Sequence, residues 1–113
     1  MSFKIGLTQK RKELLEYELS RIIPKIIQLN VEKIILFGSL TSDNIHKSSD
    51  IDLIIVKKSN KKFLDRLEEF YQFLNPSLSL DILVYSPEEF YELKENNHFI
   101  KSALKNGRII YER

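Results

Sequence analysis

The chain has 113 residues, 42% of them hydrophobic, which suits one domain with one core over residues 1–113 and leaves little room for a second. The absence of cysteine excludes disulfides and thiolate metal sites, and no segment resembles a signal peptide or reaches the roughly 20 apolar residues of a membrane helix. We therefore expect a soluble, cytoplasmic protein, and its mild net charge of +2 does not favour a nucleic-acid partner.

The first half of the chain predicts a helix and two strands. Apolar residues at helical spacing indicate a helix over residues 8–29, in which Pro24 either introduces a kink or starts a second short helix. The apolar run 33–37 predicts a strand that is covered on both faces, and the Ile- and Leu-rich run 51–56 predicts a second strand. Between them, the mostly polar residues 40–49 predict a loop with one helical turn near its start.

The next part of the chain predicts a helix followed by a strand. Ser59-Asn60 is expected to open the helix, and Asn75-Pro76 is expected to end it. The apolar stripe between these limits includes Phe70 and Tyr71, which we expect in the core. A third strand is predicted at residues 78–85.

A strong helix start follows this strand. Ser86 can act as N-cap, with Pro87 at the first helical position and Glu89 completing a capping box. The helix is expected to bend or break near Asn96-Asn97. It should end in a C-cap at Asn106-Gly107, followed by a last short strand at residues 108–111.

Phe37-Gly38-Ser39, at the end of the first strand, is a candidate phosphate-binding turn. Glycine lets the backbone approach a phosphate closely and tolerates unusual φ angles. Ser39 adds a hydroxyl, and backbone amides at the start of a helical turn favour an anion. Considered alone, a Gly-Ser pair after a strand is more often a plain turn.

Two aspartates begin the second strand. Asp50 and Asp52 are two residues apart, so in a strand their carboxylates project from the same face. Their mutual repulsion would become binding energy if they shared a divalent cation. The alternative is structural, with Asp50 capping the loop and Asp52 solvated at the strand end.

A third carboxylate, Asp81, lies inside the apolar third strand. An aspartate there is costly unless it is paired or bound to a metal, although an edge-strand position facing water would also accommodate it. A phosphate-binding turn and three carboxylates together fit a site with two magnesium ions about 3.5–4 Å apart, which stabilise the attacking and leaving oxygens of an in-line displacement.

These motifs resemble those of a known family. Gly38-Ser39, ten further residues and then Asp50-Ile51-Asp52 resemble the Gly-Ser-x10-Asp-x-Asp signature of the minimal nucleotidyltransferases of the polymerase-beta superfamily. The strand with Asp81 and the C-terminal strand also resemble that family. The resemblance implies an α/β (α+β) fold, in which a small mixed sheet is flanked by helices as in the polymerase-beta palm.

The resemblance also implies roles for the site residues. Gly38 and Ser39 would bind the β- and γ-phosphates of a nucleoside triphosphate, for which ATP is the natural choice. Asp50 and Asp52 would ligate both Mg²⁺ ions. Asp81 would ligate the catalytic ion, and whether it also acts as a base is left open.

The chain departs from the family pattern directly after Ser39. Members commonly carry Arg-x-Arg-Gly or a similar sequence there, whereas this chain has Leu40-Thr41-Ser42-Asp43. A cationic contact to the triphosphate must therefore come from elsewhere, with Lys47 and Lys57 as candidates.

Relatives of this kind are often encoded beside a helical ribonuclease toxin of the HEPN class. They act as its antitoxin by binding it and adding AMP to a tyrosine. The resemblance therefore implies a protein adenylyltransferase with a HEPN-type partner. Two alternatives remain open: an antitoxin that neutralises by contact without catalysis, and a transferase acting on RNA ends or a small molecule.

Overall fold

A four-stranded mixed sheet forms the centre of the protein. The computed structural model describes residues 2–42, 45–46 and 48–113, with side chains from Gly6 onward. The strands lie in the order β3-β2-β1-β4. Strand β1 is antiparallel to β2 and β4, and β2 is parallel to β3. Their bounds are β1 Lys33–Phe37, β2 Ile51–Val56, β3 Leu80–Tyr85 and β4 Arg108–Glu112.

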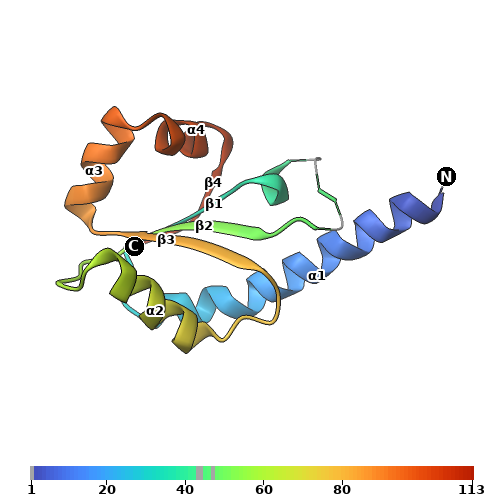
Figure 1. Ribbon diagram of the computed structural model, residues 1–113, viewed down its shortest axis with the longest axis horizontal. Coiled ribbons are helices and arrows are strands. Elements are labelled where there is room, and N and C mark those ends of the chain that lie inside the picture. The colour runs from blue at the N-terminus through green and yellow to red at the C-terminus, as the bar shows by residue number, and fades with distance from the viewer. Residues whose placement is uncertain (1, 43–44, 47) are drawn as a thin grey trace.

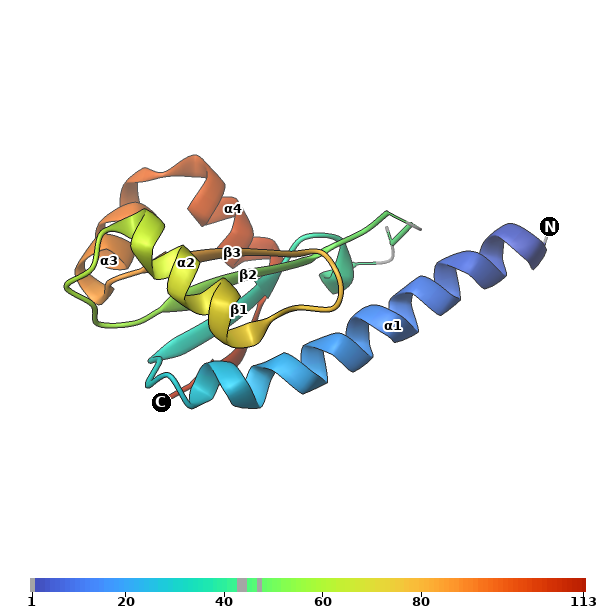
Figure 2. The same ribbon diagram turned by 60° about the horizontal axis from the view of Figure 1, so that its bottom comes forward.

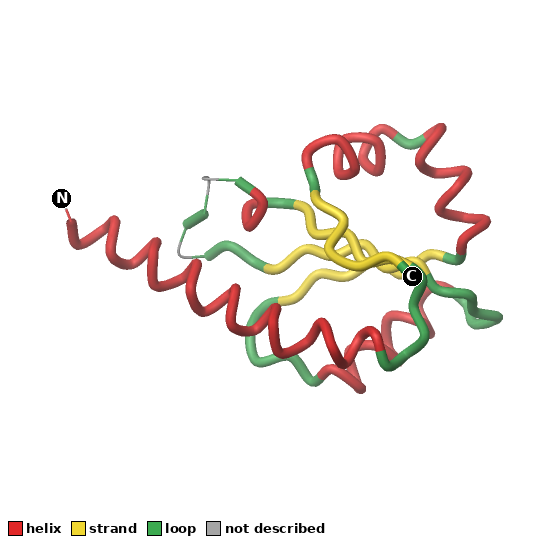
Figure 3. The backbone as a smooth tube through the Cα atoms, turned by 180° about the vertical axis from the view of Figure 1, so that it is seen from behind, coloured by secondary structure: helices red, strands yellow, loops and turns green. Residues whose placement is uncertain are grey.

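Helices cover both faces of this sheet. Helices α1 and α2 lie on one face, and α3 and α4 lie on the other (Figures 1, 2 and 3). The N-terminal half of α1 runs out past the strands (Figure 1). No helix among the described residues is long and apolar enough to cross a membrane. The helical elements are α1 Ser2–Ile27, the short 3-10 helix η1 Ser39–Thr41, α2 Phe63–Leu74, α3 Pro87–Asn96 and α4 His98–Asn106.

The two layers of helices explain why the first two strands are apolar at nearly every position. In β1, Ile34 and Leu36 pack with α1 and α2, whereas Ile35 packs with α3 and α4. All three side chains are at most 1% exposed. Because alternate side chains of a strand point to opposite faces, only a strand covered on both sides needs apolar residues throughout. The predicted mixed sheet flanked by helices is confirmed.

The first helix differs from its predicted limits. It begins at Ser2 and continues through Pro24 to Ile27 as one element. Proline removes one backbone donor, and here that loss falls in the final turns, where little helix remains to be disrupted.

Helix α2 begins later than predicted, at Phe63. The hydroxyl of Ser59 instead accepts a hydrogen bond from the Lys61 N–H (3.1 Å), which forms a turn before the helix.

The predicted helix start at Ser86 and the break near Asn97 are confirmed. Ser86 and Glu89 form a reciprocal capping box. Asn97 separates α3 from α4 and caps α4 by accepting a hydrogen bond from the Ile100 N–H (3.0 Å).

Gly107 follows α4 but has an ordinary φ of −91°. A side chain there would come within 2.6 Å of the Leu36 carbonyl, so glycine is required for close packing rather than for a left-handed cap.

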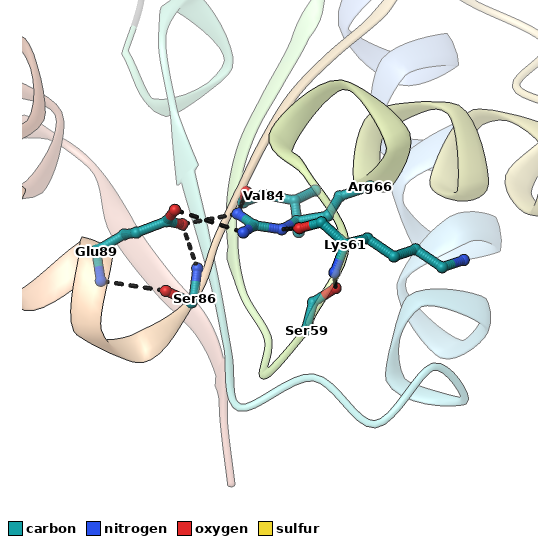
Figure 4. A network of polar contacts seen from close by, with 6 residues as sticks. All are labelled: Ser59, Lys61, Arg66, Val84, Ser86 and Glu89. Carbon is teal, nitrogen blue, oxygen red and sulfur yellow. Dashed lines mark hydrogen bonds and ion pairs between the residues drawn. The ribbon is translucent and has the colours of Figure 1, made fainter.

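A buried arginine joins the two helical layers at the end of β3 (Figure 4). The Arg66 guanidinium, on α2, donates to the Val84 and Lys61 carbonyls and to the Glu89 carboxylate (3.1, 2.9 and 2.7 Å). Arg66 is 6% exposed, whereas the Glu89 side chain is 44% exposed. Since Glu89 also caps α3, this network connects α2, β3 and α3.

A second ion pair, between Glu18 and Arg21, anchors α1. Glu18 is 3% exposed and accepts hydrogen bonds from Arg21 (2.8 Å) and from the Ser77 N–H (2.6 Å). The hydrogen bond from Arg21 is the main cause that lowers the pKa of Glu18. Glu18 and Arg21 therefore fasten α1 to the loop between α2 and β3.

We expect Arg66→Met to lower the free energy of unfolding by about 2–3 kcal/mol, because the Val84 and Lys61 carbonyls lose a buried donor. Urea denaturation followed by circular dichroism measures this loss. Arg108→Met, at an exposed position of β4, is the matched control and should change stability by less than about 0.5 kcal/mol. Equal losses in both variants would contradict a structural role for the Arg66 network.

Candidate active site

The Gly38-Ser39 segment forms the predicted turn at the end of β1. Gly38 has φ 80° and ψ −160°, a conformation that is essentially restricted to glycine. The turn continues as η1, in which the Thr41 N–H and hydroxyl both donate to the Gly38 carbonyl (3.1 and 2.7 Å). Ser39 is the first residue of η1.

Gly38 is also required because the Asp52 carboxylate lies directly against it. A Cβ atom at Gly38 would overlap Asp52 Oδ2. The candidate phosphate-binding turn and the central carboxylate are therefore in van der Waals contact. Sequence spacing alone did not indicate this contact.

The sheet register brings Asp52 and Asp81 together. Asp52 pairs with Phe37 across the antiparallel strands and with Asp81 across the parallel strands. Directly paired residues of neighbouring strands project from the same face. That face is the one on which α3 and α4 pack. Asp50 precedes β2 by one residue, so four of the predicted site residues, Gly38, Asp50, Asp52 and Asp81, meet at one end of the sheet.

The pKa of Asp52 reflects its neighbours. It is raised to about 6, chiefly by burial. The charges of Asp81 and Asp50 and a hydrogen bond with the Asp81 carboxyl group also contribute to this rise. Asp52 therefore resists ionisation in the absence of a cation, as expected for a carboxylate in a cluster of like charge.

The chemistry of these donors fits a divalent metal. Carboxylate oxygens are the ligands that Mg²⁺ prefers, and a cation would offset the repulsion within the cluster. In the part of the chain that the structure describes, no three His, Cys, Asp or Glu side chains already surround a common point. Closing a metal site around Asp52 would therefore require side-chain rotation within this cluster.

Arg11 holds the segment that carries Asp50, a role that sequence analysis missed. Its Nε and Nη2 atoms donate to the Ser49 carbonyl (3.1 and 2.8 Å). Ser49 is 3% exposed, and its hydroxyl accepts a hydrogen bond from the His46 N–H (2.9 Å). Arg11 is one of three consecutive basic residues, Lys10, Arg11 and Lys12, and no local sequence signal separates it from its neighbours.

Tyr71 holds the strand on both sides of Asp81. Strand β3 is an edge strand and Asp81 is exposed, as the structural alternative for this residue required. The Tyr71 hydroxyl donates to the Leu80 carbonyl (2.7 Å) and accepts from the Ile82 N–H (3.3 Å). Sequence analysis placed Tyr71 in the core. Its hydroxyl, within an otherwise Leu- and Phe-rich stripe, was the signal for a second role.

The suggestion that Lys57 contacts the triphosphate is wrong. Lys57 follows the far end of β2, five residues beyond Asp52, which places it about 16 Å away along the strand. Lys47 lies outside the described residues. Leu40, which directly follows Ser39, is buried at 8% exposure and supplies no charge to the turn.

We expect Gly38→Ala to lower the free energy of unfolding by about 1–3 kcal/mol, because the added methyl group meets Asp52 in a conformation that disfavours alanine. Gly6→Ala is the matched control. Gly6 lies in α1 with open space around it, so this change should raise stability by about 0.5–1 kcal/mol. Thermal unfolding of both variants tests the prediction, which fails if Gly38→Ala is as stable as the unchanged protein.

We expect Asp52→Asn to raise Tm at pH 7.5 in the presence of EDTA. The folded-state pKa of Asp52 is raised to about 6, which means that the folded protein accommodates the protonated carboxyl group better than the charged one. The resulting stability of the folded state is fully present below pH 4 and is lost as the pH rises through 6. Because Asp52 is partly exposed, the gain should be about 1 kcal/mol, or about 4 °C.

The difference between the two proteins should vanish near pH 4, where Asp52 is protonated and uncharged like asparagine. Asp65→Asn, at an exposed position of α2, is the control and should show no such pH-dependent gain. A Tm difference for Asp52→Asn that does not change with pH would show that carboxylate repulsion is not its cause.

Comparison with known proteins agrees with this geometry. Among curated proteins, no relative matches the sequence. The chain is similar in structure to a candidate nucleotidyltransferase from Sulfolobus solfataricus, with a TM-score of 0.68 and 19% identity over 95% of this chain and 88% of that one. Residues 10–113 match the family described as polymerase beta, nucleotidyltransferase. That family generally uses a nucleoside triphosphate and a divalent metal. With the turn at Gly38 and the carboxylates at one end of a mixed sheet, the chain belongs to the polymerase beta nucleotidyltransferase family.

Proposed function

We propose that this protein is a magnesium-dependent nucleotidyltransferase that transfers AMP from ATP to a tyrosine hydroxyl of a HEPN-type toxin and thereby acts as its antitoxin. The observation that carries the enzymatic part is the position of Asp52, which contacts Gly38 on one side and pairs with Asp81 on the other. The Asp52 carboxylate thus lies between the phosphate-binding turn at Gly38 and the proposed proton acceptor Asp81.

Each site residue has a role in this proposal. Gly38 and Ser39 would hold the β- and γ-phosphates, Asp50 and Asp52 would hold two Mg²⁺ ions, and Asp81 would be a further ligand of the catalytic ion. The ions neutralise the charge on the reacting phosphate oxygens. Arg11 and Tyr71 are positioning residues, since they hold the backbone beside Asp50 and Asp81 respectively.

The reaction exchanges a phosphoanhydride bond for a phosphoester bond. The acceptor oxygen forms a bond to the α-phosphorus, and the bond from that phosphorus to the oxygen bridging the β-phosphate breaks. Pyrophosphate leaves, and the acceptor proton passes to Asp81 or to water. Asp81 suits this proton transfer because it is exposed on an edge strand, where an incoming hydroxyl can reach it.

A protein acceptor is supported by two exposed regions, the β3 edge at the site and apolar side chains of α1. The edge position of β3 leaves Asp81 accessible to a second molecule. On α1, Leu14 and Tyr17 are 45% and 73% exposed, and a partner could bury them. The small net charge of +2 gives less support for an RNA acceptor.

One observation favours the alternative of an antitoxin that acts by contact alone. Leu40 is buried in the turn where relatives carry a basic residue, so η1 supplies no cation for the triphosphate. The carboxylate cluster supports the enzyme instead. A protein that only binds has no use for Asp52, since its repulsion with Asp50 and Asp81 destabilises the fold.

The test is transfer of label from α-labelled ATP with Mg²⁺ to a HEPN-type protein encoded beside this one. We expect label on that partner with the unchanged protein and at least a 100-fold loss with Asp50→Ala/Asp52→Ala, because electrostatic stabilisation of the transferred phosphate is removed. Asp65→Ala, on the exposed side of α2, is the matched control and should label the partner normally.

Two results would contradict this proposal. In the first, the unchanged protein and the double variant both bind the partner tightly while the partner stays unlabelled. That result would indicate an antitoxin that acts by contact alone. Label on RNA in the absence of any protein partner would indicate an RNA-directed transferase. Thermal unfolding of the double variant separates loss of catalysis from loss of the fold.

A further inference from the structure

A cleft of about 500 Å³ lies beside the Gly38 turn and has no role in the site described above. Phe37 from β1 and Phe99 from α4 line it, and their rings meet edge to face with centroids 5.6 Å apart. Phe99 is 54% exposed, so much of its ring is open to solvent. An exposed aromatic ring next to a candidate phosphate-binding turn suggests a platform for another flat group.

The lining of the cleft is uncharged. Its polar members are short hydroxyl and amide side chains, including Thr41, Ser102 and Asn106. The amide of Asn106 donates to the Ser102 hydroxyl (3.4 Å). Such a surface suits a neutral planar molecule with hydrogen-bonding edges. It offers no charge partner for a phosphate, an acidic peptide or a basic peptide.

The cleft is continuous with the candidate active site. Gly38 belongs to both the cleft and the turn, and Phe37 pairs with Asp52 across the sheet. Asp81 pairs with Asp52 from the opposite side. A molecule whose phosphates contact the turn can therefore extend into the cleft, while an acceptor approaches from the β3 edge without competing for this space.

Two other clefts among the described residues lack this combination. A cleft of about 650 Å³ along α2 is lined mainly by charged and amide side chains, such as Asp65 and Glu68. A cleft of about 370 Å³ contains Phe63 and Tyr85, but it lies at the Glu89 end of the sheet, beyond the far end of β3 from Asp81. Only the Phe37–Phe99 cleft, of these three, touches the Gly38 turn.

We propose that the Phe37–Phe99 cleft binds the nucleobase of the nucleoside triphosphate, with the base against the Phe99 ring and its edge toward Ser102 and Asn106. This inference rests on the proposed function, because it requires the phosphates to lie at Gly38 and Ser39. The volume of the cleft falls within the range of about 300–1,000 Å³ that is usual for small-molecule sites.

Isothermal titration calorimetry with Mg²⁺ and either ATP or tripolyphosphate tests the proposal. Tripolyphosphate presents the phosphates without a base. Phe99→Ala should weaken ATP binding about 5- to 100-fold, the usual effect of losing one base-stacking aromatic ring, and should leave tripolyphosphate binding unchanged. Phe99→Tyr keeps the ring and should bind ATP like the unchanged protein.

Tyr91→Ala is the matched control, since Tyr91 is another exposed aromatic residue, 66% exposed on α3. It should alter neither affinity, and circular dichroism checks that each variant is folded. ATP binding that is unaffected by Phe99→Ala would overturn the base subsite while leaving the proposed function intact. An unchanged protein that binds neither ATP nor tripolyphosphate would overturn both.

Discussion

The antiparallel pairing of β1 with β2 places the Gly38 backbone against the Asp52 carboxylate, and the rest of the site depends on this contact. The pairing can form because both strands are apolar and buried on both faces, which fixes their register. A slip of one residue would move Asp52 to the face on which α1 and α2 pack and would bury a charge in the main core. The same hydrophobic pattern that stabilises the sheet therefore sets the position of the catalytic candidates.

The site is held from outside the sheet by long polar side chains. Arg11 reaches from α1 to Ser49, and the Tyr71 hydroxyl bridges the β3 backbone on either side of Asp81. These contacts hold the backbone beside two carboxylates and leave the carboxylates themselves accessible. Such support matters because a cluster of like charges would otherwise tend to spread apart. At the other end of β3, Arg66 and Glu89 connect the two helical layers and complete the frame.

Stability and function oppose each other at Asp52. Its pKa is raised to about 6 by burial and by Asp81 and Asp50, so its charged form at neutral pH weakens the fold. A chain selected only for stability or for contact with a partner would not need that arrangement. The carboxylate cluster at Asp52 fits an enzyme in which the nucleotide reaches from Gly38 toward Phe99 and the acceptor approaches at the edge strand.

Local sequence patterns were enough to locate the central strands and the residue types that meet at the candidate site. Strands β1 and β2 have their predicted limits because each is a short apolar run that suits a covered strand, and the Ser86 capping box is a purely local signal. The remaining features arise from packing, since they depend on residues far apart in the chain. The contact of Gly38 with Asp52, the support from Arg11 and Tyr71 and the burial of Glu18 and Arg66 all follow from how the elements pack. Local patterns cannot distinguish an arginine that anchors a loop from one that faces water, because the difference lies in which element is packed against it.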